Sequence, residues 1–190
     1  MKTRKWLQPI HEPYYNANHL LDKYGVVISI GSRGKGKTLS WKLNAIYNTL
    51  NFGKETIYLR RFKTELKESK TKFLGDLYEG DKRLENEKIE IKGNTLYVNE
   101  KPSIHFVALS TSLNLKSVSY HNVNMLIFDE FLTLGYKLRG VNEETIFLEF
   151  LETTFRTRDD IFIVLLSNAI STTSKYYEIF GFDKPINPKR

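Results

Sequence analysis

The sequence predicts an α/β fold in which helices flank a mainly parallel sheet, and three observations carry this prediction. The apolar run at residues 26–30 leads through a glycine-rich loop into apolar residues at helical spacing. Two further apolar runs, at residues 123–128 and 161–166, are typical of strands buried on both faces. Between them, the apolar residues of segment 142–155 recur at helical offsets. Strands that alternate with helices in this way favour parallel strands joined by helical connections.

Length and composition narrow the class of protein. The chain has 190 residues, which is enough for one domain with a sizeable core. Its net charge of +7 favours contact with a polyanion such as nucleic acid, although solvated lysines give the same balance. Because the chain has no cysteine, disulfides and thiolate metal sites are excluded, and we expect an intracellular protein. The longest apolar run is too short to span a bilayer, so we expect a soluble protein with no membrane partner.

A glycine-rich loop follows the first predicted strand and matches the pattern G-x-x-x-x-G-K-[ST] without interruption. Its glycines let backbone N–H groups turn inward around phosphate oxygens, Lys37 reaches the β- and γ-phosphates, and Thr38 offers a hydroxyl to Mg²⁺. The next helix directs its positive N-terminal end at the same anion. We therefore predict a P-loop NTPase that binds a nucleoside triphosphate, ATP or GTP, with Mg²⁺. The predicted nucleotide-binding residues are Gly31, Ser32, Arg33, Gly34, Lys35, Gly36, Lys37 and Thr38.

The elements on either side of this loop can be predicted in order. Residues 1–24 mix aromatic residues with prolines and predict an irregular arm, in which Tyr14 and Tyr15 are candidates to stack on a base. Apolar residues at helical spacing after the loop, with Gly53 as a stop, predict an amphipathic helix. Residues 56–60 then predict a second strand, reached by a right-handed crossover.

The pattern of residues 62–118 predicts an inserted segment that stands off the main sheet. We expect this segment to act as a lid. Its lysine-rich first part predicts one partly exposed helix. Apolar residues then alternate with polar ones on either side of Gly93 and Asn94, which is the pattern of a tight β-hairpin. Residues 104–109 predict a further strand.

The densest basic stretch precedes this segment and runs into it. Arg60, Arg61 and Lys63 interleave with Tyr58 and Phe62. This mixture is typical of a surface that contacts a nucleic-acid backbone, and we predict the three basic residues as candidate DNA contacts. A solvated helix face is the alternative interpretation.

A pair of carboxylates follows the buried run at residues 123–128. Ligands of an open α/β sheet bind at the carboxyl ends of its strands, so Asp129 is placed to support the hydrated Mg²⁺. Glu130 is then free to orient and deprotonate the attacking water. This pair favours ATP hydrolysis over transfer to a metabolite. An exposed acidic turn is the alternative interpretation.

Two polar pairs flank the last predicted strand. Ser167 and Asn168 follow it, where they either sense the γ-phosphate or cap the helix after residue 170. Arg156 and Arg158 precede it, and a guanidinium group suits the charge that spreads over phosphoryl oxygens in the transition state. One of them is therefore a candidate arginine finger, supplied to a neighbouring subunit. A surface ion pair with the adjacent aspartates is the alternative.

Several blocks together give the chain a family resemblance. Besides the phosphate loop, they are IYLRRFKTEL at residues 57–66, FDEF at 128–131, FRTR at 155–158 and LSNA at 166–169. Over about residues 15–180 the chain resembles the DNA-encapsidation ATPases of small short-tailed bacteriophages. The resemblance implies a P-loop ATPase of the class with an additional strand and a catalytic glutamate. By this resemblance, Lys37 and Thr38 bind the triphosphate and Mg²⁺. Asp129 supports the metal, and Glu130 is the general base.

The resemblance also implies partners. Family members work as homo-oligomeric rings, commonly pentamers, on a capsid portal, and they move double-stranded DNA. In such a ring Arg156 acts in trans, Lys116 is a second candidate for a trans-acting residue, and Arg158 is either trans-acting or structural. The expected location is the host cell cytoplasm, with transient attachment to the procapsid portal. Family members carry a second, nuclease-like domain, and the linker-like residues 183–190 are expected to begin it, after an ATPase domain at residues 25–182.

The predicted function is ATP hydrolysis that drives viral DNA into a procapsid. Three alternatives stay open on the sequence. They are another DNA-translocating or helicase-type P-loop ATPase, a P-loop kinase of a nucleoside or metabolite, and a non-catalytic DNA-binding protein that keeps a nucleotide-binding loop. A kinase needs an acceptor pocket and lid arginines rather than the pair formed by Asp129 and Glu130.

Overall fold

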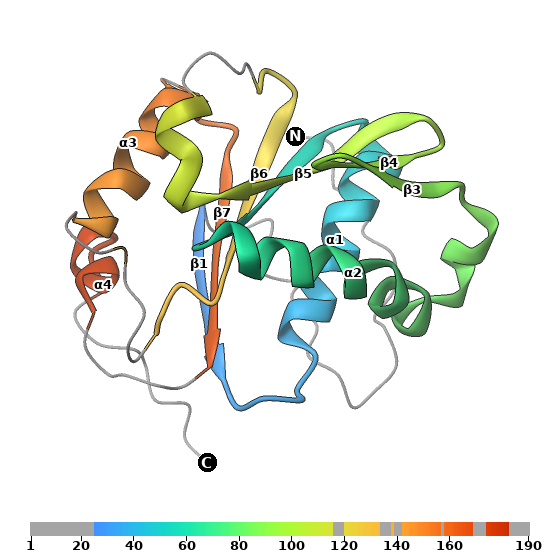
Figure 1. Cartoon of the computed structure of the whole chain (residues 1–190), viewed down its shortest axis with the longest axis horizontal. Coiled ribbons are helices and arrows are strands. Elements are labelled where there is room, and N and C mark those ends of the chain that lie inside the picture. Colours follow the sequence, from blue (N-terminus) through green and yellow to red (C-terminus); the bar gives the residue numbers. More distant parts are fainter. Residues whose placement is uncertain are drawn as a thin grey trace.

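Helices cover both faces of a seven-stranded sheet in the computed structural model (Figure 1). The structure describes residues 25–115, 120–133, 138, 142–156, 158–168 and 174–182, without the side chains of 113–115. The predicted N-terminal arm, Lys116 and the C-terminal tail lie outside the described residues. The predicted α/β class with a mainly parallel sheet is confirmed.

The strands lie in the order β1-β7-β6-β2-β5-β4-β3. The parallel ones are β1 (Val26–Gly31), β7 (Phe162–Asn168), β6 (Val123–Asp129), β2 (Glu55–Arg60) and β5 (Lys101–Ala108). The antiparallel edge consists of β4 (Thr95–Val98) and β3 (Ile89–Lys92). One strand, β7, therefore lies between the strand that leads into the phosphate loop and the strand that ends in Asp129. This is the additional strand that the family resemblance implied.

The helices divide between the two faces of the sheet. The α-helices are α1 (Lys37–Phe52), α2 (Lys63–Gly80), α3 (Glu143–Phe155) and α4 (Lys175–Ile179). Two 3₁₀ helices, η2 (Lys82–Asn86) and η3 (Leu109–Leu115), complete the connections. Figure 1 shows α1 and α2 on one side of the sheet and α3 and α4 on the other. Among the described helices, none combines the length and the apolar character that crossing a membrane requires.

Each face of the sheet has its own core. On the α1 and α2 side, the fully buried Trp41 contacts Phe162 with ring centroids 5.6 Å apart. On the other side, Phe128 of β6 packs against Phe147 of α3 and Tyr176 of α4, at 5.2 and 5.9 Å. Burial of one such side chain contributes about 1.5–3 kcal/mol. Because β6 is buried along its whole length, it has apolar neighbours on both faces, as the continuous apolar run predicted.

Glycines with left-handed backbone fix both ends of α1. Gly36, with φ 77°, precedes the first helical residue. Gly53, with φ 62°, ends the helix, and its backbone N–H donates to the carbonyls of Asn48 and Thr49. A residue without Cβ adopts these angles at no steric cost. The predicted stop at Gly53 is confirmed.

The predicted hairpin is present, but the expectation that it stands off the main sheet is wrong. β5 pairs in parallel with β2, and β4 pairs with β5, so that the hairpin forms one edge of the same sheet. The physical reason is the apolar face of these strands. Leu96, Val98 and Ile104 are buried in the core that also contains residues of α1 and α2. Pairing between distant segments, such as Thr56 with Ile104, leaves no local pattern in the sequence.

Replacement of Leu96 by alanine tests whether the hairpin belongs to the main core. We expect Leu96→Ala to lower the free energy of unfolding by about 2–5 kcal/mol, because it removes fully buried methyl groups. Urea denaturation followed by circular dichroism and by tryptophan fluorescence should show one common transition. The control Lys92→Thr changes an exposed residue of the same hairpin and should cost less than about 0.5 kcal/mol. A separate, earlier transition in Leu96→Ala would mean that the hairpin is an independent unit.

Candidate nucleotide-binding and catalytic site

The carboxyl ends of the parallel strands meet at one edge of the sheet and form the walls of a cavity of about 270 Å³. The phosphate loop follows β1, the two carboxylates lie at the end of β6, and Ser167 and Asn168 are the last residues of β7. The cavity is therefore lined by residues from all three predicted motifs. The lining residues are Arg33, Gly34, Lys35, Gly36, Lys37, Thr38, Leu39, Asp129, Glu130, Ser167 and Asn168.

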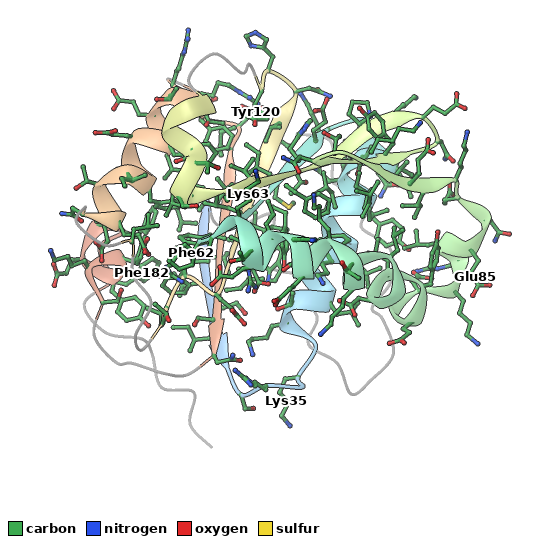
Figure 2. The ribbon with its side chains drawn as sticks, in the orientation of Figure 1. Lys35, Phe62, Lys63, Glu85, Tyr120 and Phe182 are labelled. Carbon is green, nitrogen blue, oxygen red and sulfur yellow. The ribbon has the colours of Figure 1, made fainter. Side chains whose placement is uncertain are left out.

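Within the phosphate loop, the side chain of Lys37 lies back over the preceding backbone. Its Nζ donates to the carbonyls of Gly31 at 2.9 Å and Ser32 at 2.8 Å. These two residues are the part of the predicted loop that does not line the cavity. Burial lowers the pKa of Lys37, and the negative charge of Asp129 opposes this shift. Lys35 points outward at the tip of the loop (Figure 2).

Thr38 and Asp129 place two oxygen donors side by side, and these are the residues predicted for Mg²⁺. The Thr38 hydroxyl donates to Asp129 Oδ1 at 3.4 Å. A hydroxyl and a carboxylate suit Mg²⁺, which keeps several waters and takes further oxygens from substrate phosphates. The described residues contain no group of three His, Cys, Asp or Glu side chains that could form an all-protein metal cage. The donor set therefore fits a Mg²⁺ ion shared with a nucleotide.

Arg60 links the two carboxylates, which is not the role that we predicted for it. Its Nη1 donates to Asp129 Oδ2 at 2.9 Å, and its Nη2 donates to Glu130 Oε2 at 2.8 Å. The Arg60 side chain is only 11% exposed. The guanidinium group is thus committed to the carboxylates at the end of β6, and the interpretation of Arg60 as a DNA contact is not supported by its position.

Arg61 is buried, so the structure contradicts the prediction that it contacts DNA. Its Nε and Nη2 donate to the two carboxylate oxygens of Glu143, at 2.7 and 2.9 Å. Its Nη1 and Nη2 also donate to the carbonyls of Glu130 at 3.0 Å and Phe131 at 2.7 Å. Glu143 in turn accepts from the Tyr176 hydroxyl at 3.0 Å. Arg61 therefore fixes the backbone at Glu130 to the first residue of α3.

Lys63 is the third residue of the predicted DNA contact, and it differs from the two arginines. It is exposed at the start of α2, beside Phe62 (Figure 2). Its interpretation as a DNA contact stays a prediction.

Glu130 combines an accessible side chain with a strained backbone. Its side chain is 49% exposed, and its φ is 59°, in the left-handed region that a non-glycine residue rarely adopts. Among the described residues, the other non-glycine residues with positive φ are Asn99 and Glu100 in the turn after β4, and Arg156. Strain of this kind is retained where surrounding contacts hold the residue, and the bonds from Arg60 and Arg61 are such contacts.

Ser167 and Asn168 lie beside the carboxylates, as predicted. β6 and β7 pair in parallel with Asp129 opposite Leu166, which places both residues at the cavity. The hydroxyl of Ser167 is buried and has no hydrogen-bond partner among the described protein groups. The next described helix, α4, is capped by Ser174, which accepts from the backbone N–H of Tyr176. Among the described residues, Ser174 rather than Ser167 or Asn168 therefore caps α4, and the position of the pair at the cavity favours the sensor interpretation, which stays a prediction.

Arg156 lies at the end of the strands opposite to the cavity. It follows α3 directly and precedes β7, whose carboxyl end forms the cavity wall. Six residue rises of about 3.3 Å separate the two ends of β7 by about 20 Å. Figure 1 shows the phosphate loop at the bottom of the view and the connection from α3 to β7 at the top. Arg156 is exposed and cannot reach the cavity of its own chain.

Arg158 lies at the same end of the strands as Arg156, but its guanidinium group is hydrogen-bonded to residues of its own chain. Its Nε and Nη2 donate to the carboxylate of Asp160 at 2.9 and 2.8 Å, and its Nη1 donates to the carbonyl of His121 at 3.1 Å. The hydrogen bond from Arg158 lowers the pKa of Asp160. This is the surface ion pair that the alternative interpretation expected.

Tyr58 was not predicted as a residue of the site. The hydroxyl of Tyr58 donates to Asp129 Oδ2, the oxygen that also accepts from Arg60. Strand periodicity could have found it, because residues 58 and 60 share one face of β2. The sequence analysis interpreted Tyr58 as an aromatic residue of a basic surface instead.

The comparisons with known proteins agree with this geometry. The family model "Podovirus DNA encapsidation protein (Gp16)" matches residues 11–190. The DNA packaging protein of Bacillus phage phi29 is 29% identical over 179 residues, which are 93% of this chain and 52% of that protein. The DNA packaging protein of Bacillus phage B103 is 33% identical over 164 residues, 84% of this chain and 49% of that protein. The chain thus spans about half the length of the curated relatives it matches.

Solved structures extend the comparison. The N-terminal domain of the DNA packaging ATPase from bacteriophage phi29 is similar with a TM-score of 0.80 and 28% identity, over 92% of this chain and 89% of that one. A large terminase ATPase domain of Thermus phage P74-26 shares the fold at a TM-score of 0.56 and 14% identity, over 82% of this chain and 63% of that one. By the family match over residues 11–190, the chain belongs to the Podovirus DNA encapsidation protein (Gp16) family.

Proposed function

We propose that this chain is the ATP-hydrolysing part of a motor that moves double-stranded viral DNA into a procapsid. The observation that carries the proposal is the position of Asp129 and Glu130, which face the phosphate loop across one cavity. A loop alone explains binding, whereas a carboxylate beside the phosphate site explains hydrolysis. The family, and the similarity to the phi29 packaging ATPase domain, support DNA packaging as the purpose of the hydrolysis.

Nucleotide binding follows from the loop and its neighbours. Backbone N–H groups of the loop and the N-terminus of α1 receive the phosphates, and Lys37 exchanges its two carbonyl acceptors for phosphate oxygens. Thr38 and Asp129 would hold Mg²⁺, which when bound would supply positive charge to offset that of the triphosphate. Ser167 of the adjacent strand offers its hydroxyl, which has no hydrogen-bond partner among the described groups.

Glu130 serves as the base that takes the proton of the attacking water. Its Oε2 accepts from Arg60, so Oε1 is the oxygen left for water. The Arg61 side chain holds the backbone carbonyl of Glu130, and the Arg60 side chain holds its carboxylate at the cavity. Such fixed placement is what general-base catalysis requires.

Among the described residues, the site of one chain has no cation for the transition state beyond those of the loop and Arg60. We propose that Arg156 of a neighbouring subunit supplies this cation, because Arg156 is exposed at the end of the strands opposite to the cavity of its own chain. This arrangement needs a head-to-tail contact between subunits, and we propose that the contacts close into a ring, a pentamer on the capsid portal, assembled in the host cell cytoplasm. The exposed Lys63, with further lysines of α2, remains the proposed contact to DNA.

The substitution Glu130→Gln tests hydrolysis. It removes the base but leaves the phosphate loop intact, so ATP turnover should fall about 10²–10⁴-fold while nucleotide affinity changes little. Phosphate release and equilibrium binding of a fluorescent ATP analogue measure the two effects. Glu149→Gln, an exposed residue of α3, is the matched control and should behave as wild type. Wild-type phosphate release that requires an added metabolite would contradict the proposal and indicate a kinase.

Mixed subunits test the trans-acting arginine. Rings of Glu130→Gln subunits alone, or of Arg156→Ala subunits alone, should be nearly inactive, with a loss of about 10³–10⁵-fold in rate for the missing finger. A mixture should recover activity, because some interfaces then pair an intact Glu130 with an intact Arg156.

The experiment with mixed subunits has two controls. Arg158→Ala should retain activity, since Arg158 is bound to Asp160 of its own chain. Glu130→Gln subunits mixed with subunits that carry both substitutions should stay inactive. Full activity of dilute, monomeric Arg156→Ala would show that no arginine is shared between subunits.

A further inference from the structure

A buried tyrosine hydroxyl contacts the carboxylate that the proposed function assigns to Mg²⁺. Tyr58 of β2 is 1% exposed, and its hydroxyl donates to Asp129 Oδ2. Arg60, two residues further along the same strand, donates to the same oxygen at 2.9 Å. The other oxygen, Oδ1, accepts from the Thr38 hydroxyl. The two oxygens of Asp129 thus have different partners on opposite sides.

The ring of Tyr58 is held in a fixed position. It packs edge to face against Phe73 of α2 and Phe106 of β5, with centroids 5.3 and 5.9 Å away. The parallel pairing of β2 with β6 sets the height of the hydroxyl along the sheet. The packing of the ring and the pairing of the two strands together fix the hydroxyl beside Asp129.

A carboxylate with one oxygen saturated by two donors cannot turn freely. Tyr58 and Arg60 together occupy Oδ2, which leaves Oδ1 directed at Thr38. The hydrogen bonds of a ligating carboxylate orient it and contribute to metal affinity. We infer that Tyr58 is a positioning residue, which selects the oxygen of Asp129 that faces the metal and thereby sets the affinity of the site for Mg²⁺. This inference rests on the proposed function.

Tyr58→Phe removes only the hydroxyl. The ring and its contacts with Phe73 and Phe106 remain, so the core keeps its packing. Asp129 keeps a single donor on Oδ2 and is free to exchange its oxygens. Since loss of an outer partner of a metal ligand costs about 10–100-fold in metal affinity, the same range is expected here.

The chain offers a matched control in Tyr47→Phe. Tyr47 of α1 is 5% exposed, and its hydroxyl donates to Asp81 Oδ2 at 2.5 Å. Asp81 lies at the end of α2 and does not line the cavity. The control removes the same group from the same kind of buried pair. It should lower the free energy of unfolding in a similar way and leave Mg²⁺ binding unchanged.

The measurement is nucleotide binding without turnover. A fluorescent, non-hydrolysable ATP analogue is bound to wild type, Tyr58→Phe and Tyr47→Phe, first in EDTA and then across a Mg²⁺ titration. Binding of Mn²⁺ in the presence of the analogue, followed by electron paramagnetic resonance, gives a second readout. In EDTA the three proteins should bind alike. In the titration, the Mg²⁺ concentration for half-maximal binding should rise about 10–100-fold in Tyr58→Phe alone.

Other outcomes overturn the inference in distinguishable ways. Equal titration curves for Tyr58→Phe and Tyr47→Phe would overturn it and leave the proposed function intact. A loss of binding in EDTA that matches the loss in Mg²⁺ would assign a purely structural role to Tyr58. A wild-type chain that binds no nucleotide would overturn the proposed function and the inference with it.

A double-mutant cycle with Asp129→Asn gives an independent check. If Tyr58 acts through Asp129, Tyr58→Phe should add no further loss of Mg²⁺ affinity in the Asp129→Asn background. Additive losses would contradict the inference.

Discussion

The parallel alignment of β1, β7, β6 and β2 is the constraint on which the site depends. It brings their carboxyl ends to one edge of the sheet, so that the phosphate loop, Asp129 and Ser167 line one cavity although they are far apart in the chain. The same alignment places the residues directly before each of these strands at the opposite end, away from the cavity. Arg156, which precedes β7, is therefore necessarily remote from its own cavity. One topology thus yields the proposed phosphate site and, at the far end of the strands, an arginine that we propose to serve the site of another chain.

Strand alternation gives the two adjacent arginines at the end of β2 different tasks. Arg60 faces the carboxylates of Asp129 and Glu130, whereas Arg61 lies in the core and binds Glu143 and the backbone carbonyl of Glu130. The candidate base is consequently held through its side chain by one arginine and through its peptide by the next. These bonds account for the persistence of a left-handed backbone at Glu130. Because Arg61 also reaches the first residue of α3, it connects the candidate base to the helix that Arg156 follows.

Local features of the sequence were sufficient for much of this structure. The phosphate loop is contiguous, the buried strands are continuous apolar runs, and Gly93 marks the hairpin turn, so each could be predicted from neighbouring residues. The edge position of the hairpin could not, because it depends on pairing between β2 and β5 across a long separation. The roles of Arg60 and Arg61 were also missed, since basic residues beside exposed lysines have the same local pattern whether their partners are DNA or buried carboxylates. Only the position of β6 beside β2 distinguishes the two cases.

The central claim is that the cavity of one subunit is completed by Arg156 of the next. A structure of the assembled ring with a non-hydrolysable ATP analogue tests it most directly. We predict that the γ-phosphate lies among Lys37, Thr38 and Glu130 of one chain, with the neighbour's Arg156 guanidinium within hydrogen-bond distance of a γ-phosphate oxygen. A ring in which Arg156 faces solvent, and in which residues of a single chain enclose the γ-phosphate, would contradict it.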